Sequence, residues 1–102
     1  MAVKNQKVKV IYYGLIQSVV KKREEEIELP FDVTVAQLIA FLVERYGEEF
    51  QSSIYSPEGE VRYTARILLD GQDVRETQGL DTKIKGKKEA SILVMVPPMA
   101  GG

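Results

Sequence analysis

A run of five apolar residues close to the end of the chain constrains the fold more than any other feature. This run, Ile92–Val96, is typical of a buried strand, and Pro97 and Pro98 follow it directly. Two consecutive prolines remove two backbone donors and disfavour a helix, so the sheet is expected to stop there. The sequence therefore predicts a domain of residues 1–96 that closes with a buried strand, and a tail of residues 97–102.

The tail is expected to be extended, thin and reactive at its end. Its six residues can reach roughly 15–20 Å beyond the body, and Gly101 and Gly102 have no Cβ. Its reactive group is the Gly102 carboxylate, and Gly101 is a slim neighbour that tolerates unusual backbone angles. The rest of the tail is expected to enter a partner: Pro97, Pro98, Met99 and Ala100. A linker-like end without function is the alternative, because Gly-Gly is common in linkers.

Composition narrows the chemistry that the chain itself can perform. The 102 residues include no cysteine and no histidine, which excludes disulfides, thiolate nucleophiles, imidazole bases and most zinc sites. The net charge of −1 gives no general attraction to nucleic acid or to anionic membranes. The longest apolar run, Leu38–Val43, is far short of the ~20 residues that span a bilayer, and Met1–Lys7 has no signal-peptide core. We therefore expect one cytoplasmic domain that binds no metal or cofactor.

The clearest element of the sequence is a helix of about residues 34–46. Thr34 can cap it, Gln37 completes a capping box, and Val33 and Leu38 form a hydrophobic staple. Gly47 is expected to end it in a left-handed conformation. Its apolar stripe consists of Val35, Leu38, Ile39, Leu42, Val43 and Tyr46. This spacing predicts that the helix packs one face against a sheet.

Alternating and β-branched residues predict the remaining strands. Two early strands are expected at Lys7–Tyr13 and Glu26–Leu29, with a short helical turn at 15–20 between them. A hairpin is expected later, with Ala65–Leu69 and residues 72–74 joined by the turn-forming pair Asp70-Gly71. With the last strand placed centrally beside the first, this order predicts an α+β roll: a mixed sheet of four to five strands with one main helix across one face.

Three stretches give weaker signals. The sign reversal in Lys21–Glu26 is expected to be a solvated connection with self-compensating charge. Residues 48–64 predict only an irregular hairpin or a long loop, and no histidine is present to activate their serines. Four lysines precede the last strand: Lys83, Lys85, Lys87 and Lys88. They are either a solvated loop or a docking point for an acidic partner near the tail.

Several motifs together resemble one known family. They are Lys7–Tyr13, Glu28-Leu29-Pro30 before Thr34-Val35, and the ending Pro97–Gly102. On these motifs the chain resembles the small, sulfur-carrying subunit of molybdopterin synthase, a ubiquitin-like β-grasp protein. The chain departs from the usual family pattern at Gly86–Glu89, where an acidic turn is common, and in the longer stretch Gln51–Thr64.

The resemblance implies a chemistry that depends on partners. An adenylyltransferase of the ubiquitin-activating type would use ATP and Mg²⁺ to convert Gly102 into an acyl adenylate. A sulfur donor would then leave a thiocarboxylate, which delivers sulfur to a pterin precursor in the large subunit, on the way to a molybdenum or tungsten cofactor. Val94, Met95, Val96 and Met99 are candidate contacts at the base of the tail. Two alternatives stay open: a ubiquitin-like modifier joined through Gly102 to lysines of target proteins, and a sulfur carrier of another pathway.

Overall fold

The structure is a computed structural model, and it describes residues 5–95 of the chain. The elements, in chain order, are β1 (Asn5–Gly14), α1 (Ile16–Val20), β2 (Glu24–Pro30), α2 (Val35–Tyr46), α3 (Glu48–Ile54), β3 (Ala65–Leu69), β4 (Gln72–Asp73), η1 (Val74–Glu76), η2 (Gly79–Asp81) and β5 (Glu89–Val94). The tail proposed from the sequence, residues 97–102, lies outside the described residues, as does Val96.

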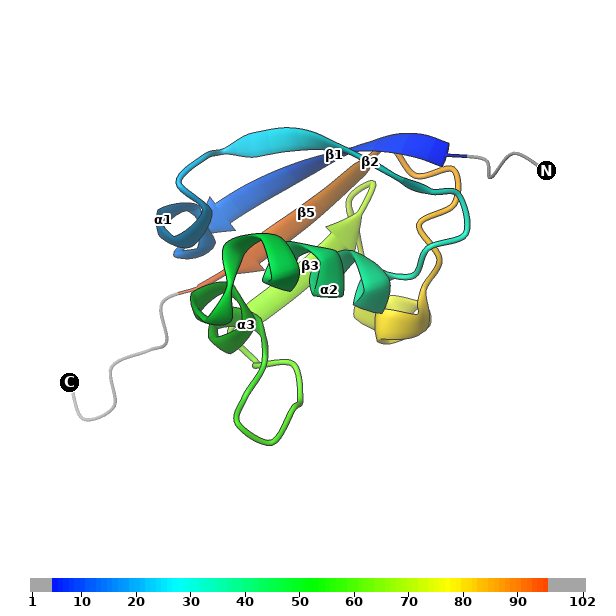
Figure 1. Cartoon of the computed structure of the whole chain (residues 1–102). Helices are drawn as coiled ribbons and strands as arrows, with labels where there is room; N and C mark the ends of the chain where they lie inside the picture. Colours follow the sequence, from blue (N-terminus) through cyan, green and yellow to red (C-terminus); the bar gives the residue numbers. More distant parts are fainter. Residues whose placement is uncertain (1–4, 96–102) are drawn as a thin grey trace.

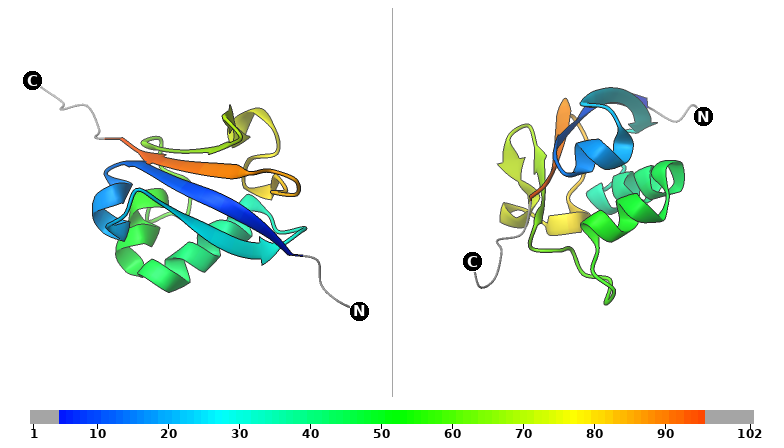
Figure 2. Two further views of the ribbon diagram at one scale, coloured as in Figure 1. Left: turned by 90° about the horizontal axis from the view of Figure 1, so that it is seen from above. Right: turned by 90° about the vertical axis from the view of Figure 1, so that its left-hand side faces the viewer.

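The five strands form one mixed sheet in the order β2-β1-β5-β3-β4. β5 lies between β1, to which it is parallel, and β3, to which it is antiparallel. The three α-helices lie on one side of this sheet, and the other face is free of helices (Figures 1 and 2). The predicted α+β roll with a central last strand is therefore confirmed.

The last strand differs from the prediction in its bounds. It begins at Glu89, three residues before the apolar run, and it ends at Val94. Ala90, Ile92 and Val94 are buried under the helices, whereas Glu89, Ser91 and Leu93 point to the open face. Polar and apolar residues therefore alternate at the start of the strand, before the continuous apolar run at its end.

Helix α2 has the start that the sequence predicts. The Thr34 hydroxyl accepts from the Gln37 amide at 3.2 Å, and the Gln37 side chain accepts from the Thr34 amide at 2.8 Å. The residues buried against the sheet are Val35, Leu38, Ile39 and Leu42. Gly47 ends the helix at φ 90° and ψ −164°, an extended conformation of positive φ rather than the predicted left-handed one. The chain can therefore enter another helix at once.

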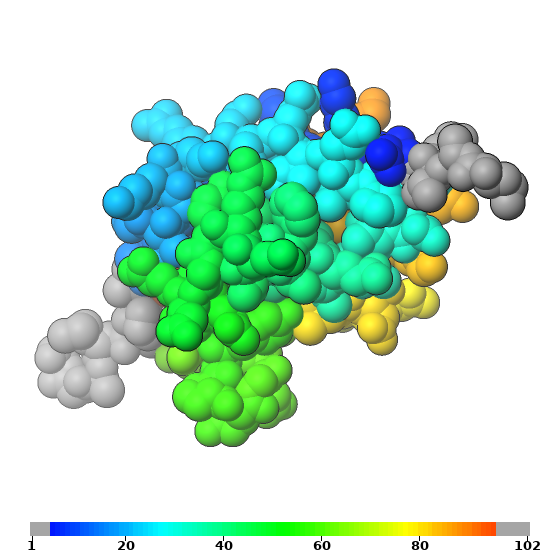
Figure 3. All heavy atoms as spheres, viewed as in Figure 1, coloured from blue at the N-terminus to red at the C-terminus, as the bar shows by residue number. Residues whose placement is uncertain are grey.

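That helix, α3, is the element the sequence did not predict. Phe50 and Ile54, four residues apart, are both fully buried in the core, and Glu48 and Glu49 favour its first turn. After the helix, a single antiparallel bridge between Tyr55 and Val61 closes an irregular hairpin. This loop projects from the body (Figure 3). The predicted irregular hairpin is thus confirmed for the second half of the stretch only.

The predicted late hairpin is confirmed. β3 and β4 pair at Leu68 with Asp73 and at Leu69 with Gln72. The two turn residues, Asp70 and Gly71, both have positive φ, of 48° and 86°. Such a two-residue turn matches the twist of the strands that it joins.

A polar cluster around Glu25 corrects the prediction for the charged stretch 21–26. The Glu25 carboxylate is 10% exposed, lies in β2, and accepts from the Tyr12 hydroxyl at 2.6 Å and from the Tyr46 hydroxyl. Lys22 and Arg45 lie 3.4 and 3.5 Å from it. β2 therefore begins at Glu24, two residues earlier than expected, and the charge run is partly a link between β1, β2 and α2 rather than a solvated connection.

Burial and hydrogen bonding shift the pKa of Glu25 in opposite directions. Burial by itself raises the pKa of Glu25, but the two tyrosine hydroxyls together with Lys22 and Arg45 outweigh it, and the pKa is lower than usual. The pKa of Tyr12 is raised well above its ordinary value, first by burial and then by its hydrogen bond to Glu25. The cluster is thus held as one carboxylate and two neutral hydroxyls.

Candidate functional site at the tail exit and the open sheet face

The end of β5 is held from both sides where the chain leaves the sheet. The carbonyl of Val94 accepts from the Leu15 amide, and the amide of Met95 donates to the Thr64 carbonyl, each at 2.8 Å. Met95 is the last residue of the described part. Any segment that follows it therefore starts from a position fixed by backbone hydrogen bonds on two neighbouring segments.

Gly14 allows the chain to pass close to β5 at this exit. It has φ +74°, and a Cβ built there would lie 2.2 Å from the carbonyl oxygen of Val94. No L side chain fits that space without a backbone shift. A glycine at the end of β1 is thus required by the contact of this strand with β5.

The open face of the sheet carries apolar side chains beside the exit. Cross-strand register places Tyr13 beside Leu93, and Ile11 and Leu68 on either side of Ser91. We define the apolar strip as the outward-facing residues Ile11, Tyr13, Leu68, Leu93 and Met95, all of which are partly or fully exposed. Tyr13 is the most open of them, at 46% exposure. The strip leads to Met95, the last described residue before the proposed tail.

The rest of the open face is charged. Lys9 lies opposite Glu26 on β2 and opposite Glu89 on β5, and its amine lies 3.5 Å from the carboxylate of Glu24. Lys7 faces Glu28 one pair further along. Apolar surface is therefore concentrated at the exit end of this face, where Arg66 of β3 lies opposite Leu93, and alternating charges cover the other end.

Sequence reasoning missed this strip and misplaced one of its neighbours. Val94, which was a candidate contact at the base of the tail, points inward and is 5% exposed, whereas Met95 faces the open side. Val96 and Met99 lie outside the described residues. A signal was present in β1, where the four successive residues Val10–Tyr13 are all apolar. Only one face of such a strand packs in the core, here with Val10 and Tyr12, so Ile11 and Tyr13 are available to a partner.

The lysine cluster lies at the other end of β5. Lys83, Lys85, Lys87 and Lys88 precede Glu89, the first residue of the strand, whereas the chain leaves the sheet after Val94 (Figure 1). A six-residue strand separates the two ends by about 20 Å. The prediction that this cluster lies near the tail is therefore wrong, because the cluster and the tail exit are at opposite ends of β5.

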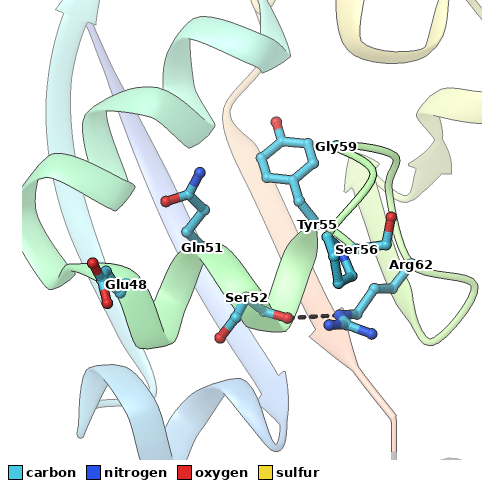
Figure 4. A pocket seen from close by; sticks show the side chains of 8 residues that line it. Glu48, Gln51, Ser52, Tyr55, Ser56, Gly59 and Arg62 are labelled. Atoms are coloured by element: carbon cyan, nitrogen blue, oxygen red, sulfur yellow. Dashed lines mark hydrogen bonds between the residues drawn. The ribbon is translucent and has the colours of Figure 1, made fainter.

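A pocket between α3 and the loop after it has a structural explanation. It has a volume of about 540 Å³ and is lined by Glu48, Gln51, Ser52, Tyr55, Ser56, Pro57, Gly59 and Arg62. The Arg62 side chain donates to the Ser52 carbonyl at 2.6 Å, a bond drawn in Figure 4. The Arg62 amide donates to the Ile54 carbonyl at 2.8 Å. Arg62 therefore caps the end of α3.

Within residues 5–95, no group of three or more acidic side chains could hold a metal ion.

None of the helices described here is long and apolar enough to cross a membrane.

Sheet order, helix placement and tail exit define the class of the protein, a ubiquitin-like β-grasp domain. The chain belongs to the ThiS family, whose model matches residues 10–102. The resemblance stated from the sequence is thereby confirmed at the level of a sulfur carrier of this type.

Three relatives illustrate the similarity. A protein of Archaeoglobus fulgidus assigned as a sulfur carrier is 37% identical over 70 residues, which cover 69% of this chain and 75% of the relative. A Pyrococcus furiosus structure assigned as molybdopterin converting factor subunit 1 is 27% identical, with a TM-score of 0.61 and coverage of 90% and 98%. Small archaeal modifier protein 1 from Methanosarcina acetivorans is 21% identical, with a TM-score of 0.67 and coverage of 97% and 99%, and shows the shared fold.

Proposed function

We propose that this protein is a sulfur carrier in the biosynthesis of the molybdenum cofactor and that the carboxylate of Gly102 carries the sulfur. The observation that supports this most directly is the family match, which extends through the residues proposed as the tail, to position 102. The similarity to the Pyrococcus protein favours the molybdopterin pathway over other sulfur-carrier pathways.

The chemistry begins with activation, because a free carboxylate repels nucleophiles and has no good leaving group. An adenylyltransferase of the ubiquitin-activating type, binding ATP and Mg²⁺, joins the Gly102 carboxylate to AMP and releases pyrophosphate. A sulfur donor then attacks the acyl carbon and displaces AMP, which leaves a thiocarboxylate. In the large subunit of molybdopterin synthase, that sulfur attacks the pterin precursor to form a thioester with Gly102. Water then hydrolyses the thioester, which leaves the sulfur on the pterin and restores the Gly102 carboxylate.

The described part of this chain supplies position and recognition. The hydrogen bonds of Val94 and Met95 fix the point on the sheet from which the chain continues toward the proposed tail. Pro97 and Pro98 reduce the entropy lost when the tail enters a channel. The apolar strip is the surface that the activating enzyme covers in this proposal, because an enzyme that holds the tail must also approach its exit.

Intact mass spectrometry of the protein, incubated with activating enzyme, ATP and a sulfur donor, tests the proposal. The expected result is a mass gain equal to the exchange of one oxygen for sulfur, located in the C-terminal peptide. A chain lacking Gly102 is the control and should gain nothing. Failure of the thiocarboxylate form to convert a pterin precursor with the large subunit would limit the protein to another sulfur pathway.

A second function, that of a ubiquitin-like modifier, has its own support in the similarity to the small archaeal modifier protein. In that case the acyl group of Gly102 passes to lysine amines of other proteins. Digests of cells that express a tagged chain then contain branched peptides in which Gly102 is joined to lysine. Such peptides without any thiocarboxylate form would favour the modifier over the carrier.

A further inference from the structure

A pocket of about 280 Å³ lies beside β3, near the point where the chain leaves the sheet. Ala65, which lines the pocket, is opposite Val94, the last residue of β5. The floor of the pocket is apolar: Ala65, Ile67 and Val74 are between 2% and 4% exposed. The register of β3 with β4 places Val74 opposite Ile67, so this margin of the sheet is already covered. A ligand of the pocket is therefore a side chain rather than an added strand.

The outer wall of the pocket consists of two exposed side chains. Val61 is 37% exposed, and Tyr63 is 70% exposed. Within residues 5–95, the Tyr63 hydroxyl makes no hydrogen bond and its ring stacks on no other ring. An exposed tyrosine that does nothing for the described fold is the type of residue that is enriched at the centre of protein interfaces.

Backbone hydrogen bonds hold Tyr63 beside the tail exit. The Arg62 amide donates to the Ile54 carbonyl, and the Thr64 carbonyl accepts from the Met95 amide, each at 2.8 Å. Tyr63 lies between these two residues, one position away from the contact that fixes the end of β5. A side chain on a backbone fixed in this way loses little entropy on binding. A protein that closes around the tail exit therefore meets Tyr63 and the pocket behind it.

Positive charge surrounds the pocket. Three of its lining residues are arginines, Arg62, Arg66 and Arg75, and none is acidic. The carboxylate of Asp73, which is not part of the lining, lies 3.5 Å from Arg66 and 3.0 Å from Arg75 and offsets part of this charge. Guanidinium groups bind carboxylates through paired hydrogen bonds. The site thus suits an apolar group with carboxylates on either side of it.

We propose that this pocket binds an apolar side chain of the activating enzyme, flanked by acidic residues that face the three arginines. The apolar side chain packs against Tyr63 and Val61 while the tail enters the same enzyme. The choice of enzyme rests on the function proposed for Gly102. The chemistry of the ligand does not, because it follows from the volume, the apolar floor and the charge of the pocket.

A second copy of this chain fits the pocket less well. Acidic and apolar residues alternate in Glu26–Leu29, but Ile27 and Leu29 are each 3% exposed. They could enter a pocket only if β2 left its own sheet. The ligand chemistry therefore favours a different protein.

NMR spectra of the full chain, titrated with the acetylated and amidated peptide Glu-Glu-Leu-Glu-Glu, test the ligand chemistry. We expect saturable shifts at Tyr63, Val74 and Leu80. Serine in place of the leucine should weaken binding about tenfold, because one apolar side chain is no longer buried. Lysine in place of the glutamates should weaken binding at least about fivefold. Equal affinities of the three peptides, or shifts confined to the open sheet face, would overturn the proposal.

Two spectra recorded without peptide detect other occupants of the pocket. Changes of the same signals with protein concentration would assign the pocket to a second copy of this chain. Changes of these signals when residues 97–102 are removed would assign it to the chain's own tail. Either result would overturn the proposal.

A matched pair of arginine variants tests the charge. Arg75 lines the pocket, whereas Arg23 is exposed in the turn before β2. Arg75→Gln should weaken binding of the acidic peptide about threefold at low salt, and Arg23→Gln should leave it nearly unchanged. Equal effects of the two variants would show that only the overall charge matters.

Adenylation kinetics, followed by pyrophosphate release, test the partner. Tyr63→Ser should raise KM about fivefold or more and leave kcat within about twofold, because the pocket contributes to binding and not to the reaction at Gly102. Phe41→Ser, on α2 with a side chain that is 40% exposed, is the control and should change neither. An unchanged KM for Tyr63→Ser would overturn the assignment of the enzyme. Absence of adenylation in the wild type would instead contradict the function proposed for Gly102, and the peptide titration would still decide the pocket.

Discussion

Gly14 and Val94 approach so closely that a Cβ on the glycine would lie 2.2 Å from the valine carbonyl oxygen. That carbonyl also accepts the hydrogen bond of Leu15, so it has little freedom to move aside. The end of β1, the start of α1 and the end of β5 are therefore coupled at one point. Because the proposed tail starts three residues after Val94, at Pro97, this contact links the stability of the fold to the point from which the tail continues.

Gly14→Ala is expected to destabilise the protein by roughly 2–4 kcal/mol, because positive-φ strain and overlap with Val94 add together. Urea denaturation followed by circular dichroism measures the change. Gly59→Ala is the matched control: Gly59 has φ +86° with nothing within 4 Å of an added Cβ. It should lose only about 1 kcal/mol. Equal losses for the two variants would show that the contact with Val94 is unimportant.

Glu25→Gln is expected to lower the free energy of unfolding at neutral pH by about 1–3 kcal/mol, because a charged acceptor for Tyr12 and Tyr46 is lost. The folded-state pKa of Glu25 is lower than the ordinary glutamate value of 4.5, so the stability that Glu25 contributes is present above pH 4.5 and disappears as the pH falls through the lowered pKa. The difference between wild type and variant should therefore shrink in acid. Denaturation curves at a series of pH values provide the measurement, and a difference independent of pH would contradict it.

Tyr12→Phe tests the alkaline side of the same cluster. The pKa of Tyr12 is raised in the folded state, so the wild type loses stability as the pH rises above the ordinary tyrosine value of 10.0. The variant lacks this titration and should show a flatter decline in alkali, although it is less stable at neutral pH. Tyr13→Phe, whose hydroxyl makes no hydrogen bond in the described structure, serves as the control. A parallel decline of wild type and Tyr12→Phe would rule out the titration.

Leu93→Asp places a charge in the middle of the apolar strip, beside Tyr13, and is expected to lower kcat/KM for adenylation by about tenfold or more. Pyrophosphate release by the activating enzyme measures this rate. Phe41→Asp, on the helix side of the sheet, should leave it nearly unchanged. Thermal unfolding of both variants checks that they remain folded. If the two variants were equally active, the strip would not be the surface that the enzyme covers.

Unlike the apolar strip, the lysine cluster is expected to have little effect on the rate of adenylation. Replacing Lys83, Lys85 and Lys88 by glutamine should change the adenylation rate by less than about twofold at moderate salt, because the cluster lies about 20 Å from the tail exit and exposed charges are screened over shorter distances. The same pyrophosphate assay serves here. A large, salt-dependent loss of rate would show that the activating enzyme reaches around the sheet to this end.

Local signals in the sequence were enough for the parts of the fold that local physics controls. The capping box of Thr34 and Gln37 was confirmed because both of its hydrogen bonds join residues three apart. The Asp70-Gly71 turn was confirmed because its positive-φ residues favour one hairpin geometry. Helix α3 was missed, because seven residues with two apolar positions carry little periodicity, and the helix forms by burying Phe50 and Ile54.

Taken alone, the sequence determined the order of most elements along the chain, a central last strand beside the first, the main helix, the absence of cysteine and histidine chemistry, and the resemblance to sulfur carriers. Tertiary structure decided what neighbouring strands place together: Glu25 between two tyrosines, the apolar strip beside the tail exit, and the lysine cluster at the far end of β5. The physical reason is that each of these depends on register and burial between segments far apart in the chain, which no local pattern encodes.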